Sequence, residues 1–205
     1  MACILTLDGA LAWCSAGVVR DGRVVAERVE ASGQGSALPV MARQVLLSAG
    51  KVDMVAVTVG PGSFTGLRAA LALAHGIGLA AGVPVVGVTV GEALARWASP
   101  GRSFWAATDS KRGRVFLEWN GAVRSLALDA LPEPAGKVAV AGDAAIAVAS
   151  RLAARGSNVQ LLDARRPDPL GIALAAQRGG GRPAQPLYVD PPAVRPGPAG
   201  RPAPA

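Results

Sequence analysis

The sequence predicts an α/β protein made of two tandem halves that share one order of strands. Short apolar runs, bounded by glycine and aspartate, alternate with segments of helical periodicity. In each half an aspartate ends the first strand (Asp8 and Asp109), and a two-residue hairpin turn lies downstream, Asp-Gly at 21–22 and Asn-Gly at 120–121. This repetition indicates an internal duplication, with the second copy shorter.

The first half, residues 1–99, is predicted to contain five strands and three helices. Residues 54–59 form a continuous apolar run, which is typical of a strand covered on both faces. Between residues 38 and 49, apolar side chains recur at helical spacing up to Gly50. The expected strands are 3–7, 12–19, 23–30, 54–59 and 85–90, and the expected helices are 38–49, 64–81 and 91–98.

The second half, residues 100–190, repeats this order in fewer residues. Its expected strands are 104–108, 114–119, 122–128, 138–141 and 159–162, and its expected helices are 143–154 and 169–177. Beyond it, residues 191–205 are rich in proline, glycine and alanine. Such a composition buries too little apolar surface to offset the entropy of ordering, so a disordered tail is predicted.

Composition narrows the class of protein. Of the 205 residues, 51% are hydrophobic and 17% are charged, which allows a buried core and excludes wholesale disorder. Cys3 and Cys14 are too few for a disulfide framework or a cysteine zinc site, so both are expected in the core. The charge-free stretch 69–91 contains several glycines and a proline, so it is interpreted as helix, turn and strand and not as a membrane span. A soluble, cytoplasmic protein without a signal peptide is expected.

The net charge of +7 is compatible with a nucleic acid or another acidic partner. The basic residues form no run of five or six, however, so charge alone points weakly to nucleic acid.

The densest motif is Gly-Pro-Gly-Ser-Phe-Thr-Gly-Leu-Arg at 60–68, which follows a buried strand and opens a helix. Backbone N–H groups at such a turn can bind an anion, and a Walker loop is excluded because no Lys-Ser/Thr follows the last glycine. The other interpretation is a tight structural turn, and spacing alone leaves both open. Gly60, Gly62 and Gly66 are predicted to shape the turn. Ser63 and Thr65 are predicted to cap the helix, and Arg68 is predicted to anchor it or to bind an anion.

Asp8 and Asp109 could face one cleft and hold a metal–phosphate group, as in sugar kinases and actin-like ATPases. In those proteins small hydroxyl residues follow the first aspartate and cradle phosphate. Here Asp8 is followed by Gly-Ala-Leu-Ala at 9–12, and the leucine would crowd such a site. Two turn-capping aspartates are therefore the favoured interpretation.

The helix at 64–81 contains many alanines and glycines, although each mid-helix glycine costs about 1 kcal/mol against alanine. Close contact with another helix or sheet explains that tolerance. The contact is either with the protein's own sheet and the helix at 38–49, or with a second subunit. Ala70, Ala74 and His75 are the predicted partner contacts. His75 is the chain's single histidine, so a catalytic triad or a two-histidine metal site is not expected.

The motifs in their order resemble the bacterial TsaB (YeaZ) family over residues 1–190. The 60–68 motif is the most specific. The supporting segments are Thr-Leu-Asp at 6–8, Asp-Ser-Lys-Arg-Gly-Arg-Val-Phe at 109–116 and Pro-Leu-Tyr-Val at 186–189. The resemblance implies two actin-like (RNase H-like, ASKHA) domains in tandem, the second one reduced.

The resemblance also implies a part in making threonylcarbamoyladenosine beside the anticodon of tRNA. In that pathway TsaB is a non-catalytic subunit that pairs with the transferase TsaD, while TsaE joins as an ATPase. TsaD holds a histidine-ligated metal, which a chain with one histidine cannot supply. The implied partners are TsaD and TsaE directly and tRNA indirectly, with a homodimer as the alternative when alone. No cofactor is expected on this chain alone and ATP is expected in the complex. The competing hypothesis is a small-molecule kinase or ATPase of the same fold.

Overall fold

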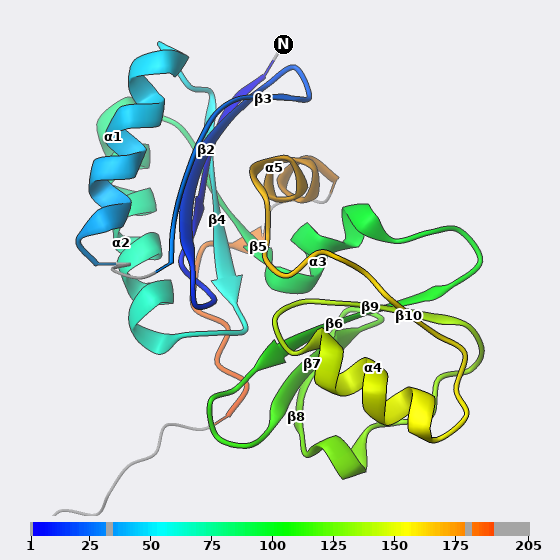
Figure 1. Ribbon diagram of the computed structural model, residues 1–205. Coiled ribbons are helices and arrows are strands. Elements are labelled where there is room, and N and C mark those ends of the chain that lie inside the picture. Colours follow the sequence, from blue (N-terminus) through cyan, green and yellow to red (C-terminus); the bar gives the residue numbers. More distant parts are fainter. Residues whose placement is uncertain (1, 32–34, 179–181, 191–205) are drawn as a thin grey trace, which may run out of the picture.

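The computed structural model describes residues 2–31, 35–178 and 182–190, which form two β-sheets with their helices (Figure 1). The first sheet has the strand order β11-β5-β4-β1-β2-β3. Its strands are β1 (Cys3–Asp8), β2 (Cys14–Arg20), β3 (Arg23–Glu30), β4 (Met54–Gly60), β5 (Val85–Thr89) and β11 (Arg182–Pro183). The predicted tail, 191–205, lies outside the described residues.

The second sheet repeats this arrangement with the order β10-β9-β6-β7-β8. In both sheets three strands form an antiparallel meander, and the first of them pairs in parallel with the fourth. The predicted duplication is therefore confirmed. The strands are β6 (Ser103–Asp109), β7 (Val115–Trp119), β8 (Ala122–Leu126), β9 (Val138–Ala141) and β10 (Val159–Leu161).

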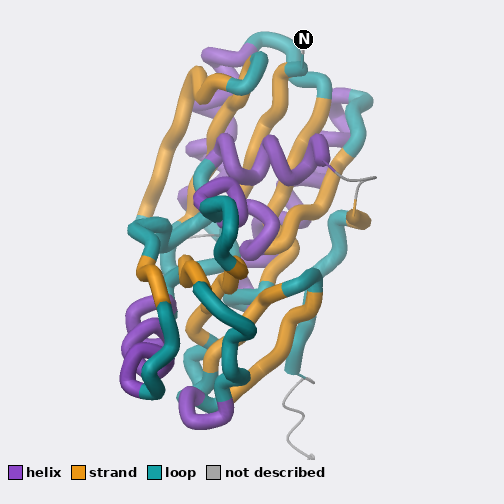
Figure 2. The backbone as a smooth tube through the Cα atoms, turned by 90° about the vertical axis from the view of Figure 1, so that its right-hand side faces the viewer, coloured by secondary structure: helices purple, strands orange, loops and turns teal. Residues whose placement is uncertain are grey.

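The helices show how the second copy is reduced. Helices α1 (Ala37–Ala49) and α2 (Phe64–Ala81) cover one face of the first sheet, as Figures 1 and 2 show. In the second domain α4 (Ala145–Ala154) corresponds to α2, while a single 3-10 turn, Leu128–Ala130, stands where α1 would be. The predicted α/β fold of two tandem domains, the second reduced, is confirmed.

The predicted domain boundary at 100–190 is wrong at its C-terminal end. Helix α5 (Pro169–Arg178) packs on the first sheet, and β11 pairs with β5 of that sheet. The reason is apolar burial, because Ile172 and Ala176 of α5 join a core cluster with Ile4 and Val88 of the first sheet. The sequence showed that this helix has an apolar face but not which sheet covers it.

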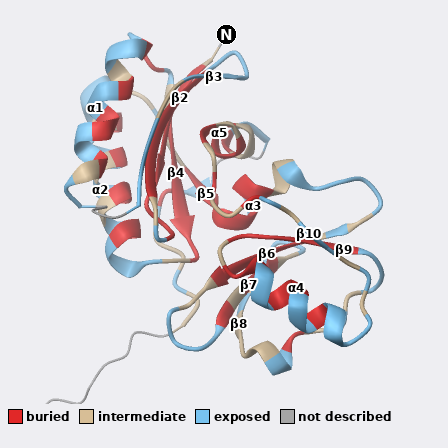
Figure 3. Cartoon of the chain, in the orientation of Figure 1, coloured by how far each residue is buried: buried red, intermediate tan, exposed pale blue. Residues whose placement is uncertain are grey.

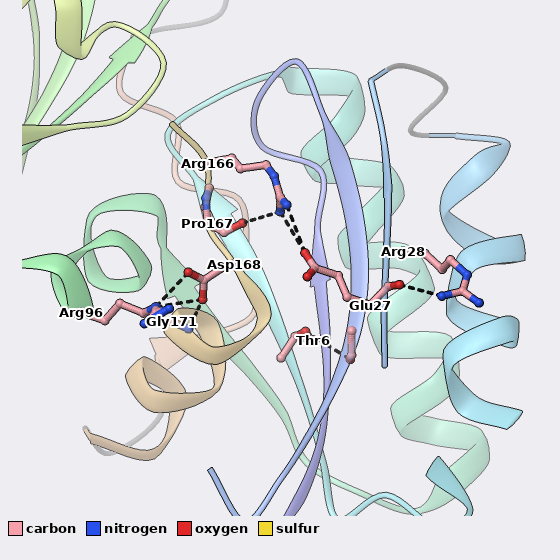
Figure 4. Close-up of polar contacts among 9 residues, drawn as sticks. Thr6, Glu27, Arg28, Arg96, Arg166, Pro167, Asp168 and Gly171 are labelled. Carbon is pink, nitrogen blue, oxygen red and sulfur yellow. Dashed lines mark hydrogen bonds and ion pairs between the residues drawn. The ribbon is translucent and has the colours of Figure 1, made fainter. Parts of the chain in front are cut away.

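Two ion pairs fix the chain where it crosses back to the first domain (Figure 4). Arg166 lies 3.1 Å from the Glu27 carboxylate of β3, and Arg96 Nε lies 2.8 Å from Asp168 Oδ2. The other Asp168 oxygen accepts a hydrogen bond from the Gly171 amide at 2.7 Å. Asp168 therefore caps the first turn of α5 and anchors it to the segment after α3 (Val90–Leu94).

Helix α2 is, by length and composition, apolar enough to cross a membrane, but it packs as a layer helix of an α/β domain. Gly82 ends it in a left-handed conformation and β5 follows, so the helix–turn–strand interpretation of 69–91 is confirmed. Figure 3 shows buried positions of α1 and α2 toward the sheet and exposed positions on their outward side. Cys3 and Cys14 are buried, as expected.

Candidate functional site

The 60–68 loop lies against the turn that follows β1. The Ser63 amide donates to the Ala10 carbonyl at 2.6 Å, and a Cβ on Gly62 would lie 2.0 Å from that same oxygen. The approach is also close at Gly9 in the turn, where a Cβ would lie 2.6 Å from the Gly66 carbonyl oxygen. Glycine is required at these positions because no side chain fits between the two backbones.

Ser63 caps helix α2. Its hydroxyl accepts a hydrogen bond from the Gly66 amide at 3.2 Å. The prediction for Ser63 is thus confirmed, but that for Thr65 is wrong, because Thr65 lies exposed inside the first turn. Gly60 adopts a φ of 119°, a conformation that favours glycine, where β4 meets the loop. The tight-turn interpretation therefore holds.

Arg68 is anchored by aromatic rings. Its Nε donates to the Tyr188 hydroxyl at 3.0 Å, and its guanidinium lies 3.7 Å from the centroid of the Phe64 ring. The Phe64 and Tyr188 rings stack with centroids 5.7 Å apart. The motif thus binds the C-terminal segment of the described chain, since the Leu187 amide also donates to the Val59 carbonyl of β4 at 2.8 Å.

This loop forms one wall of a cleft of about 600 Å³ between the two domains. The opposite wall is the β6–β7 loop, and the C-terminal segment completes the cleft. The lining residues are Ala10, Leu11, Ala12, Pro61, Gly62, Ser63, Phe64, Arg68, Asp109, Ser110, Lys111, Arg112, Phe116, Asp143, Leu187, Tyr188, Val189 and Asp190.

Asp8 does not face this cleft. Its side chain is buried, and its Oδ1 accepts from the Thr58 hydroxyl at 2.6 Å and from the Ala10 amide at 3.0 Å. Burial raises the pKa of the Asp8 carboxyl. Because Asp8 is not among the lining residues, the hypothesis that two carboxylates face one cleft is wrong, and Asp8 is a turn-capping residue.

Asp109 caps the equivalent turn of the second domain, at the edge of the cleft. Its Oδ1 accepts from the Lys111 amide at 2.7 Å, and its Oδ2 lies 2.8 Å from Lys111 Nζ. The hydrogen bond from Lys111 lowers the pKa of Asp109. The Asp109 amide donates to Asp143 at 2.9 Å, and burial raises the pKa of that carboxyl. Both aspartates therefore bear out the turn-capping interpretation.

Two of the three predicted partner contacts on α2 need correction, while His75 stays a prediction. Ala70 and Ala74 are wholly buried against the first sheet, so a partner cannot reach them. His75 is exposed, and its Nε2 lies 2.8 Å from the Ala184 carbonyl. The outward face of α2 carries small residues one helical turn apart and one large apolar residue, namely Ala72, Gly76, Ala80 and the 87% exposed Leu79.

Glu118 was not predicted from the sequence. It lies buried on β7, accepts from the Gly91 amide at 2.8 Å and from the Thr89 hydroxyl, and so joins the second domain to α3. Burial raises the pKa of Glu118. The signal in the sequence was a lone carboxylate inside the apolar strand 115–119.

The fold and this loop define a two-domain protein of the actin-like class. The family described as tRNA N6-adenosine threonylcarbamoyltransferase (TsaD) matches residues 36–161. An uncharacterized protein of Mycobacterium tuberculosis H37Rv is 31% identical over 94% of each chain. The tRNA threonylcarbamoyladenosine biosynthesis protein TsaB of Escherichia coli K12 is 33% identical over 55% of this chain and 52% of its own length.

Among solved structures, a Pseudomonas aeruginosa protein with similarity to peptidase YEAZ has a TM-score of 0.75 at 25% identity, over 93% of this chain and 100% of its own. The chain belongs to the TsaB (YeaZ) family, which takes part in threonylcarbamoyladenosine biosynthesis.

Proposed function

We propose that this chain is a cytoplasmic, non-catalytic subunit that binds a TsaD protein and supports transfer of a threonylcarbamoyl group to the adenosine next to the anticodon of tRNA. The observation that carries the proposal is the outward face of the α1–α2 layer. Small residues at 72, 76 and 80 let the backbone of a partner helix approach α2 closely, because a Cβ on Gly76 would meet no atom within 4 Å.

Exposed large apolar side chains on α1 and α2 supply contact area. Val40 and Leu47 of α1 are 56% and 80% exposed, and Leu79 of α2 is 87% exposed. Apolar groups that a monomer leaves in water gain free energy when a partner covers them. The layer has no equivalent in the second domain, where α1 is missing. This asymmetry supports one helix-rich docking face on the first domain.

The proposal assigns nucleotide chemistry to the complex. Within it, TsaE is the ATPase and this chain alone binds no cofactor. The kinase or ATPase alternative needed Asp8 and Asp109 together on a metal–phosphate group, but Asp8 lies outside the cleft that Asp109 lines. The geometry therefore favours the subunit role.

The test is light scattering during size-exclusion chromatography of this chain with TsaD from the same organism. Leu79→Arg should weaken the mixed complex by about 30-fold, the cost of losing an interface hot spot of about 2 kcal/mol. The matched control is Ile146→Arg, because Ile146 is 52% exposed on α4 of the other domain. It should leave the complex intact.

Separate peaks for the wild-type proteins, with and without ATP, would refute the proposal. ATP turnover by the isolated chain that Asp8→Asn abolishes would instead favour the kinase or ATPase alternative. Comparing Leu79→Arg with wild type in the absence of TsaD shows whether the same face also forms a homodimer.

A further inference from the structure

We propose that the mouth of the interdomain cleft binds an unpaired nucleotide of RNA, so that this chain contacts tRNA directly. The inference rests on the proposed function in taking tRNA as the RNA that the complex modifies. The features that carry it are an exposed aromatic pair, a group of cations that no carboxylate of the described residues neutralises, and a cleft of suitable size.

The aromatic pair is Phe64 from the 60–68 loop and Tyr188 from the C-terminal segment. Phe64 is 53% exposed and Tyr188 is 48% exposed, although both rings line the cleft. Their stacking and the guanidinium of Arg68 hold the rings in place. Pre-ordered aromatic and arginine planes are the surfaces on which unpaired bases stack, whatever their sequence.

Two arginines, Arg68 and Arg112, line the cleft together with this pair, and Arg114 lies close to Arg112 in the chain. Arg68 donates to the neutral hydroxyl of Tyr188, and Arg114 of the β6–β7 loop donates to the hydroxyl and carbonyl of Ser125. Arg112, in the same loop, is exposed at the edge of the cleft. Guanidinium groups in such positions are suited to phosphate oxygens.

The carboxylates of the cleft are engaged with the protein itself. Asp109 is ion-paired with Lys111, Asp143 accepts the amide of Asp109, and Asp190 accepts from the Ser125 hydroxyl at 3.2 Å. The lining arginines and the lining carboxylates without a cation are equal in number, Arg68 and Arg112 against Asp143 and Asp190, but the arginines are exposed whereas the two carboxylates are half-buried. This difference favours an anionic ligand over a cationic one.

The cleft has room for one nucleotide. Its volume of about 600 Å³ lies within the roughly 300–1,000 Å³ of small-ligand sites. Its lining includes Leu11, Phe116 and Leu187, which suit the face of a base and not a phosphate chain. The phosphates would then lie at the rim, beside Arg112 and Arg114.

The experiment measures binding of a fluorescent anticodon stem-loop RNA to the full chain by anisotropy, without TsaD. Binding should weaken by about tenfold in Tyr188→Ala, the scale of one base–aromatic stack. Tyr188→Phe keeps the ring and should bind nearly as wild type. Arg112→Ala should lower the slope of log K against log salt by about 0.7, as expected for one lost contact to a single-stranded phosphate.

The matched control is Arg151→Ala on the exposed side of α4, which should change neither quantity. Because Arg112 is exposed, its variant tests the proposal even if Tyr188→Ala fails to fold. Absence of RNA binding by the wild-type chain, or equal weakening by Arg151→Ala and Arg112→Ala, would overturn the inference. The inference would also be overturned if AMP or ATP displaced the RNA completely and bound as tightly as the RNA does, because the ligand would then be a free nucleotide.

The two proposals fail separately. Complex formation with TsaD but no RNA binding would remove only the inference about RNA. RNA binding by a chain that does not associate with TsaD would remove only the proposed subunit role.

Discussion

Replacing Gly62 by alanine tests whether the 60–68 loop is held by its contact with the turn after β1. The new Cβ would lie 2.0 Å from the Ala10 oxygen, whereas real Cβ contacts essentially never fall below 3.0 Å. The loop must therefore retreat by about 1 Å, which also lengthens the 2.6 Å hydrogen bond from the Ser63 amide to that oxygen.

The expected loss of stability combines the two effects. Overpacking costs about 1–3 kcal/mol and a weakened hydrogen bond about 1 kcal/mol, so about 3 kcal/mol in total is expected. In a chain of this size that corresponds to a fall in Tm of about 6–12 °C. Gly76→Ala is the matched control, since nothing lies within 4 Å of its Cβ. It should gain about 0.8–1 kcal/mol from helix propensity.

The assay is urea and thermal unfolding of both variants, followed by circular dichroism. A Gly62→Ala protein within about 0.5 kcal/mol of wild type, the range of neutral surface changes, would refute the reasoning. It would mean that the loop and the turn separate freely and that the close backbone approach contributes little to the fold.

Three further outcomes are expected. Asp168→Ala removes both the α5 cap and the ion pair with Arg96, so it should lower the free energy of unfolding in urea by about 1–2 kcal/mol. The control Asp163→Ala changes a fully exposed carboxylate and should leave the unfolding curve nearly unchanged. Leu117→Ala empties a wholly buried site in the second core and should cost about 2–5 kcal/mol, so its Tm should fall. Burial raises the pKa of Asp8, so the native state keeps its proton where the unfolded chain has lost it, and stability should fall as pH rises above about 4. In Asp8→Asn the free energy of unfolding, measured between about pH 4 and 8, should fall less steeply with pH than in the wild type. An unchanged pH dependence would mean that other groups cause the loss of stability.

The sequence was sufficient for most strands and for the duplication, because these depend on local pattern. The apolar run at 54–59 became β4, and the Asp-Gly and Asn-Gly pairs became the turns between β2 and β3 and between β7 and β8. Ser63 was also predictable, since a serine before the first turn of a helix caps it whatever surrounds the helix.

The residues on the outward face of α2 could not be predicted from local pattern. Small residues lie all around this helix, so its composition could not say which of them point inward. Packing on the sheet buried Ala70 and Ala74 and turned Ala72, Gly76 and Ala80 outward. A helix with small or apolar residues on every side has no single apolar stripe, so its rotation about its own axis is decided by what it packs against.

The sequence by itself determined the class of fold, the capped Gly-rich turn and the family to which the motifs belong. Each of these follows from residues close together in the chain. Only the tertiary structure decided that α5 and β11 return to the first domain, that Asp8 is closed off from the cleft, and that Phe64, Arg68 and Tyr188 meet at its mouth. These contacts join residues far apart in the chain, 120 positions in the case of Arg68 and Tyr188, and their partners are chosen by burial and shape, which no local spacing encodes.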